Sequence, residues 1–84
     1  MAYFVYILES QKDGRYYVGS THNLEDRLKR HNEGRVNYTK TNRPWELVYS
    51  EEHPDRSSAV KLENEIKAHK RRAFIEELIG RFRL

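Results

Sequence analysis

The first apolar segment of the chain is too short for a helix and has apolar side chains at consecutive positions. Residues 2–8 read Ala-Tyr-Phe-Val-Tyr-Ile-Leu, a run of β-branched and aromatic residues. This pattern predicts a strand that is buried on both faces. Alternation along the strand places Val5 and Ile7 on one face and Tyr6 on the other.

A turn signal follows this strand. Asp13 and Gly14 form a dipeptide typical of tight turns, and residues 15–19 have the composition of a returning strand. The two strands are therefore predicted to form a hairpin. Such a hairpin brings Tyr6 into the neighbourhood of Tyr17.

The next segment has helical spacing with signals at both ends. Asn23 is a suitable N-cap, because its side chain can accept a hydrogen bond from a free backbone N–H of the first turn. Leu24 and Leu28 lie on one helix face. Gly34 follows the last turn and predicts the end of the helix.

The remainder of the chain predicts one more strand and two more helices. Residues 35–45 form a basic loop without a clear period, and residues 46–52 predict a strand. Residues 54–69 predict a second helix, and the apolar positions within 74–79 predict a third, short one. The order β-β-α-β-α-α indicates an α+β fold in which helices pack on a small, mainly antiparallel sheet. We expect residues 1–84 to form a single domain.

Charge is distributed in blocks along the 84 residues, although the net charge is only +3. Residues 27–45 contain six basic residues and one acidic residue, residues 46–65 two and six, and residues 66–84 six and two. Two basic blocks thus flank an acidic one. This pattern suits a polyanion such as nucleic acid, and its alternative is a solvated surface that keeps the protein soluble.

Cysteine and membrane signals are missing from the sequence. The chain has no Cys, which excludes a disulfide framework and a Cys-based zinc site. No stretch approaches the roughly 20 apolar residues of a membrane span, and no charged-then-apolar leader opens the chain. We therefore expect a cytoplasmic protein that does not bind membranes.

One carboxylate stands on the apolar face of the second helix. Ala59 and Ile66 define that face, Glu63 lies between them, and Glu65 points to the solvent side. A buried carboxylate is costly unless it is paired or binds a metal. Glu63 is therefore a metal ligand, the partner of a nearby Arg, or a residue at the edge of the face that reaches water. A single carboxylate suits Mg²⁺, which takes its other ligands from water and phosphate.

The first helix adds two polar residues to the same region. Arg27 and His31 are four positions apart and border the apolar face. Arg27 is suited either to a structural salt bridge or to a phosphate, whose oxygens accept two of its N–H groups. His31 is either packed in the core or a proton carrier. Tyr6 and Tyr17 are either core aromatic residues or groups that handle a proton.

These residues match a known pattern. The chain resembles a GIY-YIG nuclease domain of the short, stand-alone bacterial type (UPF0213-like proteins), over nearly all of residues 3–80. Phe4 stands where the name motif has Gly, and Val18 stands in place of Ile. The segments that carry the resemblance are Phe4-Val5-Tyr6, Tyr17-Val18-Gly19, Ser20-Thr21, residues 24–32 with Arg27 and His31, residues 42–48, and residues 59–67 with Glu63.

The resemblance implies a three-stranded antiparallel sheet flanked by helices and a phosphodiesterase that uses Mg²⁺ or Mn²⁺. By that analogy Glu63 holds the metal and Arg27 stabilises charge in the transition state. Tyr6 and Tyr17 would position or deprotonate the attacking water, and His31 would serve as their proton partner.

The expected function is that of an endonuclease that hydrolyses DNA with little sequence specificity. Its substrates would be branched or damaged DNA in repair or recombination, and a protein partner or the shape of the DNA would supply specificity. Salt-sensitive phosphate contacts are expected from a set of basic residues: Arg35, Lys40, Arg43, Lys67, Lys70, Arg71 and Arg72.

Two alternatives stay open. The first is a nucleic-acid-binding domain that keeps the nuclease fold without catalysis. Many GIY-YIG domains carry a further Asn after the metal-binding Glu, whereas this chain has none after Asn64. The second is a protein-interaction module in which Glu63 and Arg27 form a structural salt bridge.

Overall fold

The computed structural model describes residues 2–69 and 72–82. Its elements follow the expected order, with one additional 3₁₀ turn in the basic loop. In chain order they are β1 (Tyr3–Ser10), β2 (Tyr16–Thr21), α1 (Leu24–Asn32), η1 (Lys40–Asn42), β3 (Trp45–His53), α2 (Arg56–His69) and α3 (Arg72–Phe82).

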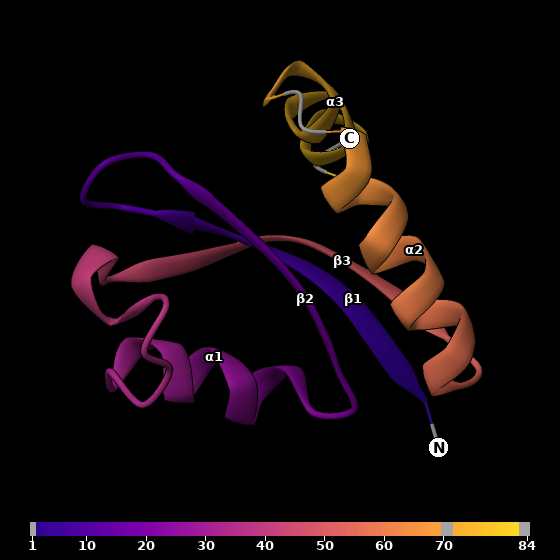
Figure 1. The fold of residues 1–84 in the computed structure, drawn as a ribbon, viewed down its shortest axis with the longest axis horizontal. Coiled ribbons are helices and arrows are strands. Elements are labelled where there is room, and N and C mark those ends of the chain that lie inside the picture. The colour runs from indigo at the N-terminus through magenta and orange to yellow at the C-terminus, as the bar shows by residue number, and fades with distance from the viewer. Residues whose placement is uncertain (1, 70–71, 83–84) are drawn as a thin grey trace.

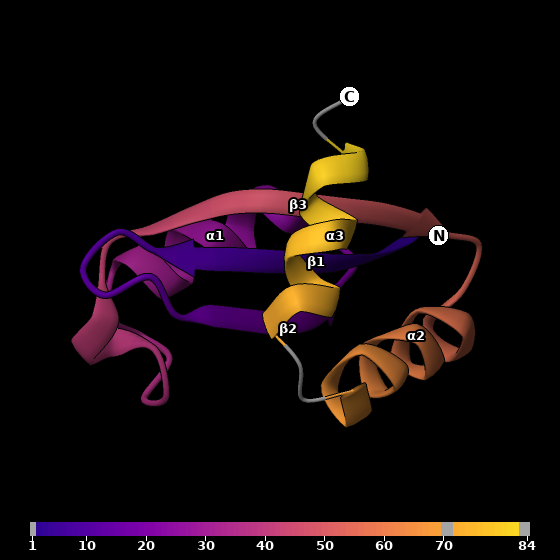
Figure 2. The ribbon, with the colours of Figure 1, turned by 90° about the horizontal axis from the view of Figure 1, so that it is seen from above.

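The strands form a three-stranded antiparallel sheet in the order β2-β1-β3. The strand β1 is central, which explains why its sequence is apolar on both faces. Figure 1 shows α1 on one side of the sheet and α2 and α3 on the other. Seen from above in Figure 2, α3 crosses over the strands and α2 lies beside the β2 edge. This architecture confirms the predicted α+β fold class.

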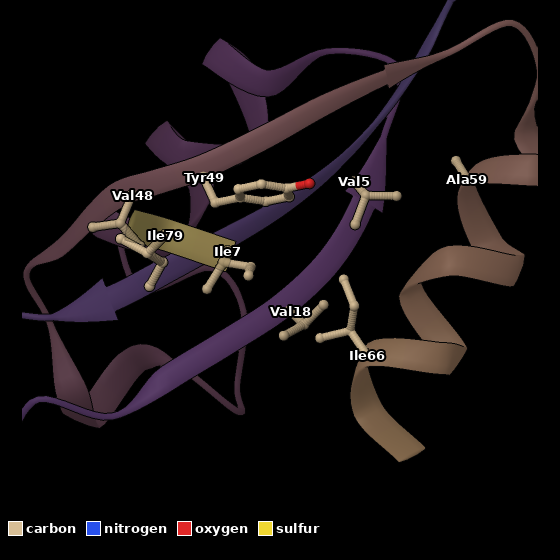
Figure 3. Close-up of a cluster of buried hydrophobic side chains, with 8 residues drawn as sticks. All are labelled: Val5, Ile7, Val18, Val48, Tyr49, Ala59, Ile66 and Ile79. Carbon is tan, nitrogen blue, oxygen red and sulfur yellow. The ribbon is translucent and has the colours of Figure 1, made fainter. Parts of the chain in front are cut away.

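The face covered by α2 and α3 holds the larger apolar core. Val5 and Ile7 of β1 are fully buried there, as the alternation predicts, and Figure 3 shows them among the side chains of this core. A register shift in the pairing of β1 with β3 leaves Val48 as an extra residue on β3. This bulge lets the consecutive residues Val48 and Tyr49 both join the same core.

The ends of α1 follow the expected capping chemistry. The side chain of Asn23 accepts a hydrogen bond of 3.0 Å from the backbone N–H of Asp26. Gly34 lies just beyond the helix with φ of +80°, a conformation that favours glycine. In the part of the chain that the structure describes, no helix combines the length and apolar character that a membrane crossing requires.

Candidate active site

A glycine on the neighbouring strand leaves room for the side chain of Tyr6. Tyr6 points to the α1 face of the sheet and lies opposite Gly19 of β2 in the strand register. A Cβ atom at position 19 would lie only 2.6 Å from the Tyr6 hydroxyl oxygen. The absent side chain therefore makes the space that the buried hydroxyl occupies.

The hydroxyl of Tyr6 is bonded to a buried histidine. Its oxygen lies 3.1 Å from Nε2 of His31, whose Nδ1 lies 2.7 Å from Oγ1 of Thr39. Thr39 can donate its own hydrogen to the carbonyl oxygen of Val36 at 3.4 Å, which favours the tautomer in which Thr39 accepts from Nδ1–H. Nε2 is then the acceptor of the neutral imidazole, and Tyr6 donates to it.

Burial keeps both groups of this hydrogen bond neutral. It raises the pKa of Tyr6, and electrostatic interactions with Tyr17 and Glu63 raise it further, while Arg27 acts in the opposite direction. Burial also lowers the pKa of His31 to about 4, and the charge on Arg27 adds to this effect. At neutral pH the cluster therefore contains an unprotonated imidazole that accepts from a protonated phenol.

Arg27 places a positive charge beside this pair. Its guanidinium interacts with both the Tyr6 hydroxyl and His31. Its Nε atom is buried and has no hydrogen-bond partner among the described residues. A buried, charged N–H group without an acceptor is costly, and an anion such as a phosphate would satisfy it.

Glu63 reaches the site from α2, on the opposite side of the sheet from α1. Its side chain is 15% exposed, and its Oε1 accepts a 2.6 Å hydrogen bond from the hydroxyl of Ser20. Lys67, one helical turn further on, donates to Oε2 at 2.6 Å. The ion partner of Glu63 is thus Lys67, whereas one alternative from the sequence had paired this carboxylate with Arg27. Glu65 is exposed, as predicted.

The carboxylate of Glu63 could hold a hydrated Mg²⁺ or Mn²⁺ if Lys67 moves away from Oε2. The described residues contain no group of three or more His, Asp or Glu side chains able to enclose a metal. Mg²⁺ commonly uses one or two carboxylates and completes its shell with water and phosphate oxygens. Ser20 orients the carboxylate, and Lys67 is 49% exposed, so its flexible side chain has solvent into which it can move away from Oε2.

Tyr17 sits at the centre of an aromatic cluster. Its ring centroid lies 4.9 Å from that of His31 and 6.3 Å from that of Tyr6, which confirms the predicted proximity of the two tyrosines. The rings of Tyr38 and Trp45 lie 5.9 Å and 6.5 Å away. Tyr17 therefore connects the buried Tyr6–His31 pair with the exposed loop that carries Tyr38.

The basic residues of the loop after α1 lie on the surface. Arg35, Lys40 and Arg43 are all exposed. Arg35 pairs with Glu33 at 3.1 Å, and Nε of Arg43 donates to the backbone oxygen of Lys40 at 2.7 Å. Their positions suit contacts with phosphate groups, although two of the three already have partners within the loop.

The second basic set is only partly described. Lys70 and Arg71 lie outside the described residues. Lys67 binds Glu63 and so stands within the candidate active site, although the sequence assigned it to the basic surface. Arg72 lies over the ring of Tyr16, with its guanidinium carbon 4.6 Å from the ring centroid.

Sequence reasoning missed three residues that shape the site. Gly19 makes space for Tyr6, Ser20 orients Glu63, and Thr39 holds His31. Alternation along β2 carries a signal for Ser20, because it shares a strand face with Val18, which packs against α2. No signal identifies Thr39, because the loop that contains it has no periodic pattern.

Comparisons with known proteins give the family. The model of the GIY-YIG catalytic domain matches residues 2–76. The chain belongs to the GIY-YIG family. This family assignment confirms the resemblance drawn from the sequence and places the chain in a nuclease family.

Bacterial relatives of this GIY-YIG domain share much of its length. A UPF0213 protein of Staphylococcus haemolyticus is 44% identical over 70 residues, which cover 82% of this chain and 84% of that protein. A UPF0213 protein of Staphylococcus aureus is 41% identical over 71 residues, 83% of this chain and 85% of that protein.

The fold has a counterpart among solved structures. The solution NMR structure of a UPF0213 protein from Bacillus halodurans matches with a TM-score of 0.60 and 36% sequence identity, over 95% of this chain and 84% of that one.

Proposed function

We propose that this GIY-YIG domain is a divalent-metal-dependent endonuclease that hydrolyses phosphodiester bonds of DNA. The observation that carries this proposal is the neutral Tyr6–His31 hydrogen bond, which lies beside the unpaired Nε of Arg27. A bound Mg²⁺ or Mn²⁺ on Glu63 would neutralise charge on the leaving oxygen. The residues of the chain supply the proton path and the anion contact.

The proton path runs from the attacking water to His31. The water oxygen forms a bond to phosphorus as the water loses a proton to the oxygen of Tyr6, and Tyr6 passes its own proton to Nε2 of His31. The bond from phosphorus to the leaving oxygen breaks in line, and solvent protonates that oxygen. The high pKa of Tyr6 prevents it from acting alone as a base, so the neutral His31 is needed as the final acceptor.

Arg27 couples phosphate binding to this proton path. A phosphate on its guanidinium brings negative charge close to His31, which favours the imidazolium that forms when the proton arrives. The same contact stabilises the additional charge of the pentacovalent transition state. Arg35, Lys40 and Arg43 would hold the flanking backbone, and such contacts carry no sequence information. This domain would therefore select its substrate by the structure of the DNA and not by its sequence, as enzymes of repair or recombination do.

The test is cleavage of supercoiled plasmid and branched oligonucleotides in Mg²⁺ or Mn²⁺. The wild type is compared with Glu63→Gln and with Glu65→Gln, a matched change on the exposed side of α2. We expect nicking by the wild type and Glu65→Gln and loss of nicking in Glu63→Gln. No nicking by the wild type, or equal nicking by all three proteins, would contradict the proposal.

One observation favours a second function, binding of nucleic acid without cleavage. The ammonium group of Lys67 lies on Oε2 of Glu63, where it supplies the positive charge that a metal would otherwise bring. If this ion pair persists on DNA, the site binds a phosphate without activating it. Salt-dependent binding with no cleavage in either metal, by the wild type and by Lys67→Met, would establish this function.

A further inference from the structure

A cavity adjoins the candidate active site at the outer edge of the sheet. Its volume is about 520 Å³, within the range of about 300–1,000 Å³ typical of small-molecule sites. The strand β2 is at an edge of the sheet, and Figure 2 shows α2 beside it. The lining residues come from β2, the basic loop, α2 and α3: Tyr16, Tyr17, Val18, Tyr38, Ile66, Lys67 and Ile75.

The cavity is lined by aromatic and aliphatic side chains, with one basic residue among them and a second one beside it. Three of its lining residues are tyrosines. Lys67 lines the cavity and binds Glu63, so the cavity adjoins the proposed metal position. Arg72 lies over the ring of Tyr16 and adds a second positive charge there. Aromatic rings beside a positively charged track are the features with which proteins bind unpaired nucleotides.

Tyr38 is exposed although its loop is firmly anchored. Its side chain is 80% exposed, whereas the next residue, Thr39, is fully buried. Thr39 binds His31 through its hydroxyl and accepts a 2.9 Å hydrogen bond from the indole of Trp45 on its backbone oxygen. The backbone that carries Tyr38 is therefore already fixed, so less conformational freedom is lost when its exposed ring stacks on a ligand.

We infer that this cavity receives one unstacked nucleobase of the strand that is cleaved. The base would stack on Tyr38, and its phosphate would extend past Lys67 towards Glu63 and Arg27. Bases inside a duplex are stacked and paired, so a site of this kind favours DNA with an unpaired nucleotide beside the cleaved bond, such as a flap or a gap. This inference rests on the proposed nuclease function and specifies the class of its substrate.

The test compares DNA flaps that differ by a single base. One substrate is a duplex with an intact single-stranded flap. Each of the others carries one abasic nucleotide, at a different flap position, so that a single base is removed and every phosphate is kept. Dissociation constants are measured by fluorescence anisotropy in EDTA, so that cleavage plays no part. The proteins are the wild type, Tyr38→Ala, Tyr38→Phe and Arg56→Ala, the last of which removes an exposed cation at the far end of α2.

For the wild type we expect one abasic position to weaken binding about tenfold, which corresponds to about 1.4 kcal/mol. Tyr38→Ala should bind the intact flap about tenfold more weakly and should not distinguish it from the abasic flap. Tyr38→Phe and Arg56→Ala should distinguish the two flaps as the wild type does. Equal wild-type affinity for all the flaps would overturn the inference, as would full discrimination by Tyr38→Ala.

Cleavage of the same flaps in Mg²⁺ separates this inference from the proposed function. If the wild type cleaves DNA but binds intact and abasic flaps equally well, the base site is overturned and the proposed nuclease function is still supported. Discrimination without cleavage would support the base site and contradict the nuclease.

Discussion

The two faces of the central sheet bury different kinds of side chain. Under α2 and α3 the buried residues are almost all apolar, with Val5 and Ile7 fully buried. Under α1 the sheet also buries Leu8 and Trp45, but there it adds the hydroxyl of Tyr6, with His31 and Thr39 fully buried nearby. Apolar burial stabilises the fold in proportion to its area. Buried polar groups must first recover the free energy of losing water, so each hydrogen bond contributes only about 1 kcal/mol.

This difference suggests that the residues that stabilise the domain are distinct from those that take part in its chemistry. A single strand, β1, supplies Ile7 to the apolar face and Tyr6 to the polar one. The hydrogen bonds of the polar cluster contribute little to stability for the number of groups they bury, so we assign the cluster the chemical role that the proposed function requires. Changes in the apolar core under α2 and α3 should therefore affect folding, and changes in the polar cluster of Tyr6, His31 and Thr39 should affect cleavage.

The largest expected effect on stability comes from the apolar face. Ile7→Ala removes a fully buried side chain and should lower the free energy of unfolding by about 2–5 kcal/mol. Denaturation in urea measures this loss. Below its unfolding transition the variant should still cleave DNA, because Ile7 faces away from the polar cluster. An Ile7→Ala variant that is as stable as the wild type but inactive would contradict the claim that this core serves stability and not cleavage.

Acid should destabilise the protein through the polar face. Between pH 6.5 and about 4 the unfolded chain protonates His31 while the folded protein keeps it neutral. The unfolded state then binds more protons, so stability is lost as the pH falls through this range. The loss attributable to His31 is about 2–3 kcal/mol at pH 4.

The control for this effect is His31→Gln. Its amide can replace both hydrogen bonds of the imidazole but does not titrate. Urea denaturation at several pH values should show a shallower acid loss for the variant than for the wild type. Parallel curves for the two proteins would show that His31 is not held neutral by burial.

A smaller change tests the space around Tyr6. Gly19→Ala places a methyl group where the Tyr6 hydroxyl lies and should cost about 1–3 kcal/mol of stability through overpacking. It should also reduce cleavage, because the hydroxyl is displaced from His31. Gly80→Ala is the matched control, since a Cβ there meets no atom of the described residues within 4 Å, and in the helix α3 it should stabilise by up to about 1 kcal/mol. Equal effects of the two changes on stability would contradict this packing.

Several parts of the fold and site could be predicted from local patterns. The central strand, the cap at Asn23 and the inward position of Glu63 depend on periodicity and on short-range chemistry, which the sequence displays directly. The ion pair of Glu63 with Lys67 also follows a local rule, the i,i+4 spacing on a helix.

Contacts that depend on tertiary structure could not be predicted in this way. Thr39 is buried because its loop folds back onto His31 and Trp45, and no nearby pattern encodes that path. The bulge at Val48 depends on strand pairing, which the sequence of a single strand does not determine. The cavity beside Tyr38 is formed by four separate segments, so it exists only in the assembled fold.

The central claim is that the hydroxyl of Tyr6 serves catalysis. Tyr6→Phe removes the donor to His31, and Tyr49→Phe, on the other face, removes a partly buried hydroxyl that donates to Glu51 at 2.6 Å. Each change should alter stability by only about 1 kcal/mol.

The decisive measurement is the single-turnover rate of DNA cleavage by these two variants. For Tyr6→Phe we predict a rate about 100-fold below that of the wild type, because the proton path is interrupted. For Tyr49→Phe we predict an unchanged rate. Equal rates for the two variants would contradict the assignment of the polar face to catalysis.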